Sequence, residues 1–301
     1  MQTDVVTGAF SYSGAAIARE LLDAGHAVRT LTGHPGRAPA VTAIDVRPLA
    51  FTDPGALERD LAGAHTLYCT YWVRFARGAV THETAVENSR VLFGAAVRAG
   101  VKRIVHVSIT HADPASPYPY FRGKGEVEGH LRATGIPYAI VRPAILFGGN
   151  GVLLNNIAWL LRRLPVFAIG GRGDYRIRPI HVRDLARLCV DLSVQPDSVT
   201  LDAVGPQSVT FREMVTAIRT ATGSRAVIVP VPGWLIPPMS AALGAALRDV
   251  LLTGEEYRAM AAGLADSAAP ATGQTVLTDW IAEHGAELGL TYASELDRHF
   301  R

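Results

Sequence analysis

Tyr120 and Lys124 stand four residues apart in the segment Tyr120-Phe121-Arg122-Gly123-Lys124. Lysine is rare in this chain, because only two of the 29 cationic side chains are Lys and the rest are Arg. On a helix, residues four apart lie on one face, so the Lys124 ammonium would lie beside the Tyr120 phenol. A nearby positive charge lowers the pKa of a Tyr from about 10, which makes Tyr120 a candidate general acid or base. The alternative is an incidental pair on an exposed amphipathic helix.

The bulk composition limits the classes of function. Hydrophobic residues make up 49% of the 301 residues and charged residues 19%, as in ordinary globular proteins. The net charge of +2 is too small to indicate a nucleic acid or an acidic membrane surface as partner. The ten His do not pair with Cys or carboxylates at ligand spacing, and we expect no metal.

The sequence indicates a cellular compartment but not an oligomeric state. Cys69 and Cys189 lie in apolar runs, which suits buried thiols in a reducing compartment better than a disulfide. The N-terminus opens into a strand-like segment with no signal peptide, and prolines and charged residues interrupt the apolar stretch 234–252, so we expect no membrane span. We therefore expect a cytoplasmic protein. Its oligomeric state, monomer or homodimer, stays open.

Short apolar runs alternate with helical patterns through the first half of the chain. Such an order predicts an α/β fold with a doubly wound parallel sheet, because parallel strands need a crossover between them. Continuous rather than alternating apolar runs agree with strands buried on both faces. The expected strands are 4–7, 27–31, 41–46, 65–70, 103–108 and 138–141, and the expected helices are 14–24, 54–62, 80–99 and 121–134.

The pattern loosens after about residue 150, where Pro and Gly become dense. We expect a dinucleotide-binding Rossmann core at 1–150. Residues 151–301 would then form a smaller, irregular, mostly substrate-binding lobe, with about 176–204 returning to the core. The expected helices here are 153–163, 182–192, 211–222 and 235–252, and the expected strands are 176–180, 199–204 and 226–229.

A glycine turn joins the first strand to the first helix. Gly8 allows a tight turn and Gly14 allows the helix to pack close to the strand, so that the helix N-terminus faces a pyrophosphate. Phe10, Ser11 and Tyr12 lie between them and are expected at the cofactor. Ser11 stands where a third glycine would sit, and its hydroxyl would donate to a phosphate instead. A purely structural turn is the alternative.

The second strand indicates which dinucleotide would bind. No acid occurs between Asp23 and Asp45, so the carboxylate that binds the ribose of NAD is missing. Arg37, helped by His34, would neutralise the 2′-phosphate of NADP. NADP is therefore the expected cofactor, with NAD possible. Alternatively, Arg37 and His34 are solvated loop residues.

Several stretches resemble a known family. They are TGAFSYSGAAIARELLDAGHAVRTLTG, AGVKRIVHVSI, YFRGKGEVEGHLRATGIPYAIVRPAILFG, RPIHVRDLA and DAVGPQSVTFREMV. The chain resembles an atypical or extended short-chain dehydrogenase/reductase of the NmrA-like and epimerase-like branch. The resemblance implies that Ser108 bonds the substrate oxygen and Tyr120 passes the proton. Lys124 would hold the nicotinamide ribose and lower the pKa of Tyr120.

The residues themselves support this placement, although the chain departs from the family pattern. Ser108 falls at the carboxyl end of an expected parallel strand, where ligands of open α/β sheets bind. Thr70, at the end of the fourth strand, is expected at the cofactor. Besides Ser11, the acid often found after the third strand is absent, since the chain has Pro48-Leu49-Ala50-Phe51 there.

An aromatic segment follows the fourth strand. Tyr71, Trp72 and Phe75 would line an apolar pocket, with Asn155 and Trp159 on a facing wall. The alternative is that the three aromatic side chains cap the core.

The sequence thus predicts an NADP(H)-dependent oxidoreductase that reduces a carbonyl or a conjugated double bond of a fairly apolar small molecule. Two alternatives stay open. One is a non-catalytic dinucleotide-binding sensor or accessory protein, since relatives in this branch have lost catalysis. The other is a nucleotide-sugar epimerase or dehydratase, which the lack of a clear diphosphate clamp disfavours.

Overall fold

The computed structural model describes residues 2–149 and 151–299. They form two compact units, which are described separately. The first contains the residues up to Pro143 together with Arg183–Ala203, and the second contains Ala144–Val182 and the residues from Val204 onward.

A seven-stranded parallel sheet forms the centre of the first unit. Its strand order is β11-β6-β5-β4-β1-β2-β3. The order reverses between β1 and β4, and open α/β sheets bind ligands at the carboxyl ends of the strands beside such a reversal. The strands are β1 (Thr3–Thr7), β2 (Ala27–Thr32), β3 (Asp45–Pro48), β4 (Thr66–Cys69), β5 (Arg103–Val107), β6 (Tyr138–Pro143) and β11 (Val199–Ala203).

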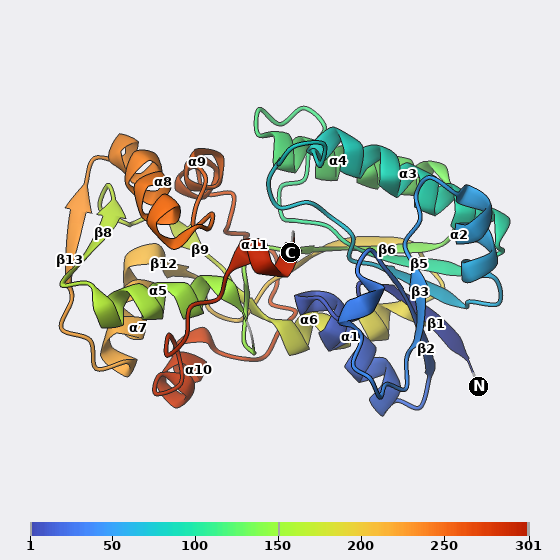
Figure 1. Cartoon of the computed structure of the whole chain (residues 1–301), viewed down its shortest axis with the longest axis horizontal. Coiled ribbons are helices and arrows are strands. Elements are labelled where there is room, and N and C mark those ends of the chain that lie inside the picture. Colours follow the sequence, from blue (N-terminus) through green and yellow to red (C-terminus); the bar gives the residue numbers. More distant parts are fainter. Residues whose placement is uncertain (1, 150, 300–301) are drawn as a thin grey trace. The chain divides into compact units, whose positions relative to one another are not determined.

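Helices cover both faces of this sheet (Figure 1). One face carries α1 (Tyr12–Asp23) and α6 (Val182–Ser193), and the other carries α2 (Pro54–Leu61), α3 (His82–Arg98) and α4 (Pro119–Ala133). A short 3-10 turn, η1 (Pro35–Arg37), follows β2. The predicted doubly wound α/β fold is therefore confirmed.

The core of this unit is the layer between the sheet and α2, α3 and α4. Leu67 of β4 and Ile104 of β5 pack there against Leu57, Leu92 and Leu131 of the three helices. All five side chains are inaccessible to solvent. Strands buried in this way hold their carboxyl ends in fixed positions, which is what a site built at those ends requires.

The second unit contains short elements around its own core. Its strands are β7 (Leu146–Phe147), β8 (Val166–Gly170), β9 (Arg176–Ile177), β10 (Ile180–His181), β12 (Val209–Thr210) and β13 (Val227–Val231), paired two by two. Its helices are α5 (Val152–Arg163), α7 (Phe211–Ala221), η2 (Gly233–Leu235), α8 (Ile236–Leu247), α9 (Gly254–Ala261), α10 (Leu277–His284) and α11 (Glu295–His299).

Three expected elements differ from the structure. The strand expected over 176–180 is divided into β9 and β10, which pair with β12 and β7 respectively. The third strand begins at Asp45, and Val41, expected within it, is 92% exposed. Pairing with β2 sets this strand, because Asp45 lies opposite Arg29 in the register and bonds to its guanidinium. The helix expected over 235–252 ends at Leu247, because Arg248 adopts a left-handed conformation with φ 55°.

The apolar stretch near residue 240 does not form a membrane-spanning helix. In the part of the chain that the structure describes, no helix is both long enough and apolar enough to cross a bilayer.

Candidate functional site

The glycine turn after β1 is tightly packed. Gly8 has φ 65°, a conformation that favours glycine, and its N–H donates to Leu31 O at 2.8 Å. Gly14 in α1 approaches so closely that an added Cβ would lie 2.2 Å from Gly8 O. No side chain fits at Gly14 without moving the turn. This cradle is the arrangement that lets a dinucleotide pyrophosphate approach a helix N-terminus.

Ser11 is the N-cap residue of α1, and its side chain makes no capping hydrogen bond. The residue is exposed, and its N–H donates to Gly8 O at 2.8 Å. Phe10 and Tyr12, on either side, are half-buried. The structure therefore brings the predicted turn residues together at the N-terminus of α1, where backbone N–H groups and the helix dipole attract an anion.

Thr70 ties the carboxyl end of β4 to that of β1. Its Oγ1 donates to Thr7 O at 2.6 Å, and its N–H donates to Thr7 Oγ1 at 2.8 Å. These bonds fix the two strands where the sheet order reverses. The predicted cofactor residue Thr70 thus lies beside the glycine turn, since a Cβ on Gly8 would be 3.9 Å from Thr70 Oγ1.

His34 and Arg37 lie in the exposed segment that follows β2. The nearest downstream acid, Asp45, is engaged elsewhere: its carboxylate bonds to Arg29 at 2.8 Å and to Arg47 at 3.0 Å. Asp45 also begins β3 rather than following β2, so it does not replace the missing ribose-binding acid. His34 and Arg37 therefore stay the predicted cofactor residues after β2.

Lys124 is buried against the sheet, one turn after Tyr120 on α4. Pro119 begins the helix, because a proline at the first helical position needs no N–H partner. The Lys124 side chain is 2% exposed, and its Nζ donates to Val107 O at 2.8 Å, directly before Ser108. Nζ also lies 4.7 Å from the centre of the Trp72 ring. An incidental surface lysine is thereby excluded.

Tyr120 belongs to a cluster of aromatic rings. It lies edge-on to both Trp72 and His82, with 5.7 Å between ring centres in each case. Trp72 therefore contacts both Tyr120 and Lys124. Gly123 permits this packing, because a Cβ there would lie 2.8 Å from the edge of the Trp72 ring.

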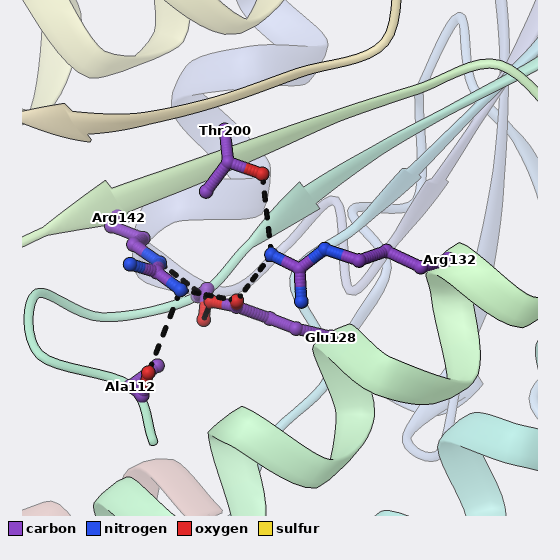
Figure 2. A network of polar contacts seen from close by, with 6 residues as sticks. Ala112, Glu128, Arg132, Arg142 and Thr200 are labelled. Atoms are coloured by element: carbon purple, nitrogen blue, oxygen red, sulfur yellow. Dashed lines mark hydrogen bonds and ion pairs between the residues drawn. The ribbon is translucent and has the colours of Figure 1, made fainter. Parts of the chain in front are cut away.

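The hydroxyl hydrogen of Ser108 is engaged in a hydrogen bond within the protein. Its Oγ donates to Glu128 Oε1 at 2.6 Å. Arg142 of β6 donates from Nε to Oε1 at 2.8 Å and from Nη2 to Oε2 at 2.5 Å, and Arg132 reaches Oε2 at 3.0 Å. Figure 2 shows Glu128 extending from α4 to lie between the two guanidinium groups. An ionic network centred on the buried carboxyl group of Glu128 thus holds the predicted catalytic serine.

The predicted pocket residues fall into two groups. Tyr71, Trp72 and Phe75 follow β4 in the first unit, and Asn88 Nδ2 donates to the Tyr71 hydroxyl at 2.9 Å. In the second unit, Asn155 binds Thr291 O at 2.9 Å and Trp159 packs edge-on to Tyr292. A role for Asn155 and Trp159 in substrate binding stays a prediction.

Sequence reasoning missed His82, Glu128 and Arg142. His82 is stacked on Trp72, and within the described residues neither His82 Nε2 nor Trp72 Nε1 has a hydrogen-bond partner, although both atoms are buried. The sequence does contain a signal for Glu128 and Arg142. Glu128 follows Lys124 by four residues, and Arg142 interrupts the apolar run of β6. Charges in such positions indicate a buried ion pair.

Burial of Lys124 makes the stability of the protein depend on pH. Desolvation lowers the pKa of the ammonium from 10.5 to about 8, against smaller opposing effects of Cys69 and Glu128. Between pH 8 and 10.5 the unfolded chain binds more protons at this residue than the folded one, so its contribution to stability rises with pH.

We therefore compare the free energy of unfolding of wild type with that of Lys124→Met. The difference, wild type minus variant, is expected to rise by on the order of 3 kcal/mol from pH 8 to pH 10.5. Groups remote from Lys124 titrate alike in both proteins, so their effects cancel in the difference. Urea unfolding of both proteins across this range measures it. A difference that stays constant with pH would show that the ammonium is not buried.

Comparison with known proteins agrees with this geometry. Residues 8–155 match the family model described as NAD(P)H-binding. The mitochondrial NADH-ubiquinone oxidoreductase 40 kDa subunit of Neurospora crassa is 27% identical over 173 residues, which are 57% of this chain. The chain spans only 45% of the length of that relative.

Solved structures share the fold along almost the whole chain. Triphenylmethane reductase from Citrobacter sp., solved with NADP(H), has a TM-score of 0.77 at 19% identity and covers 95% of this chain and 100% of its own. The NADPH-dependent quinone oxidoreductase of Escherichia coli, solved with NADPH, has a TM-score of 0.75 at 21% identity and covers 93% and 98%. Together with the glycine turn, these findings lead to one conclusion. The first unit has a Rossmann-type fold, and residues 8–155, most of which lie in it, match the NAD(P)H-binding family model.

Proposed function

We propose that the protein is an NADP(H)-dependent oxidoreductase that reduces a carbonyl or a conjugated double bond of a fairly apolar small molecule. The observation that carries this proposal is the position of Tyr120. It stands one helical turn from the buried ammonium of Lys124, which is fixed to the carboxyl end of β5. In this arrangement Tyr120 gives a proton to the substrate, and the positive charge stabilises the phenolate that is left.

The residues around the glycine turn fit a dinucleotide. The turn and the N-terminus of α1 would hold the pyrophosphate, and Thr70 would lie beside it. Within the described residues, Val107 O takes one of the three ammonium donors of Lys124, so the others are left for the nicotinamide ribose. When bound, the dinucleotide supplies the hydride, and the protein supplies orientation and the proton.

Arg37 is proposed to bind the 2′-phosphate of NADP, with His34 beside it. We expect Arg37→Gln to weaken NADPH binding by about tenfold, as for the loss of a charge-assisted hydrogen bond, and to leave NADH binding unchanged. Arg19→Gln is the matched control, because Arg19 is an exposed arginine on α1 whose ion pair with Asp23 is long, 4.0 Å. Fluorescence titration measures both. Equal losses for NADPH and NADH would contradict the assignment.

The proposed reaction is tested by NADPH oxidation in the presence of a panel of apolar acceptors: aromatic ketones, enones and the quinone menadione. We expect turnover with at least one acceptor class and a preference for NADPH over NADH. NADPH binding without turnover of any acceptor would refute the oxidoreductase proposal.

A second candidate function is a dinucleotide-binding accessory protein without turnover. Two observations favour it: the Ser108 hydroxyl already bonds to Glu128, and the Neurospora relative is named as a subunit of a larger oxidoreductase. The acceptor panel separates the two candidates, since both predict NADPH binding and only the first predicts its oxidation.

A further inference from the structure

We propose that Glu128 makes Ser108 a hydrogen-bond acceptor, so that Tyr120, and not Ser108, is the donor that activates the substrate oxygen. This inference rests on the proposed reductase function and deepens it. It differs from the role that the family resemblance implies for Ser108, which is to bond the substrate oxygen.

The direction of the Ser108 bond follows from its partner. Glu128 is 1% exposed, and both of its carboxyl oxygens accept N–H donors: Oε1 from Arg142, and Oε2 from Arg142 and Arg132. A carboxylate only accepts, so the single hydroxyl hydrogen of Ser108 must lie on the line to Glu128 Oε1. The 2.6 Å separation is that of a charge-assisted O–H···O⁻ bond, the stronger class of hydrogen bond.

Arg142 and Arg132 keep the carboxylate in place. Arg142 binds both oxygens of Glu128 in a bidentate pair, and its Nη2 also donates to Ala112 O at 3.5 Å, in the loop that follows Ser108. Arg132 comes from α4 itself and also reaches Thr200 Oγ1 on β11 at 3.3 Å (Figure 2). Rotation of the Ser108 hydroxyl towards a substrate would leave Glu128 Oε1 with one partner fewer in a buried site, which is unfavourable.

The chemical consequence concerns the substrate oxygen. When a carbonyl is reduced with hydride from the bound dinucleotide, its oxygen must gain one proton. Ser108 offers only lone pairs on its free side, and these repel the lone pairs of a carbonyl oxygen. The proton therefore comes from the Tyr120 phenol, which becomes a phenolate near Lys124, while the substrate carbonyl becomes an alcohol. Ser108 acts as a positioning residue that accepts from an O–H or N–H group.

The first test needs no ligand. Ser108→Ala should lower the midpoint of thermal unfolding by on the order of 3 °C in wild type, because a charge-assisted bond is lost. In a Glu128→Gln background the same change should have less than half that effect. In an Arg132→Gln background, where the Ser108–Glu128 bond remains, it should have its full effect. Should Glu128→Gln not fold, Glu128→Asp replaces it, since it keeps the charge but withdraws the carboxylate by one methylene.

The second test separates donor from acceptor by turnover of menadione, or of whichever acceptor the panel identifies. With Ser108 as acceptor, Ser108→Ala should lower kcat by less than about tenfold and act mainly on KM. Loss of a substrate-activating donor lowers kcat by about a hundredfold to a thousandfold, and that result would overturn the proposal. Equal midpoint shifts in all backgrounds would overturn it as well. If wild type turns over no acceptor, the reductase function fails, and the unfolding test still decides whether Ser108 donates to Glu128.

Discussion

Replacing Tyr120 with Phe is expected to lower kcat for NADPH-dependent reduction by at least about a hundredfold, because the change removes the proposed proton donor. Phe keeps the ring that packs edge-on to Trp72 and His82, so the aromatic cluster and the position of Lys124 should be preserved. We therefore expect the affinity for NADPH to stay within about twofold of wild type. Steady-state NADPH oxidation measures kcat, and fluorescence titration measures the affinity for NADPH.

Tyr118→Phe is the matched control for this change. Tyr118 lies two residues earlier, caps α4, and packs its ring on Phe121. The Tyr118→Phe variant loses a phenol hydroxyl from the same segment, and its kcat should remain close to that of wild type. Equal turnover of Tyr120→Phe and wild type would remove Tyr120 from the mechanism, and with it the main argument for a reductase.

Replacing Gly14 with Ala is expected to weaken NADPH binding by at least about a hundredfold, or to unfold the turn altogether. The new Cβ would lie 2.2 Å from Gly8 O. This oxygen belongs to the backbone and cannot turn aside as the end of a flexible side chain can, so the whole turn would have to shift. Displacing the turn moves the N–H groups that would face the pyrophosphate. Titration with NADPH and thermal unfolding of the variant measure the effect.

Gly129→Ala is the control for Gly14→Ala. Gly129 lies in α4, and nothing lies within 4 Å of an added Cβ. Alanine is a better helix former than glycine by about 1 kcal/mol, so this variant should be as stable as wild type or more stable and should bind NADPH normally. Normal NADPH binding by Gly14→Ala would show that the turn is not the pyrophosphate site.

Much of the fold follows from local sequence. The alternation of apolar runs and helical patterns predicts the parallel sheet, since most runs are long enough to be buried strands and an α-helix lies in the crossovers other than the one from β2 to β3, which contains η1. Gly8 and Gly14 could be predicted because their roles depend only on neighbours in one turn. The third strand could not, since its start is set by Arg29 across the sheet rather than by the local apolar residue Val41.

The sequence predicts which residues belong to the candidate site, but not the hydrogen bonds that they make. The spacing of Tyr120 and Lys124 placed them on one helical face, whereas the bond from Lys124 to Val107 O depends on how α4 packs on β5. The position of Ser108 at the end of β5 also follows from the sequence. The direction of its hydroxyl was not predictable, because Glu128 lies twenty residues away and Arg142 approaches from another strand.

The central claim is that this fold binds NADP(H) for reduction, and equilibrium titration of the purified wild-type protein with NADPH and NADH tests it most directly. We expect quenching of protein fluorescence with a micromolar dissociation constant for NADPH and weaker binding of NADH. Absence of binding of either dinucleotide at micromolar concentrations would contradict the account, whatever activity the protein shows.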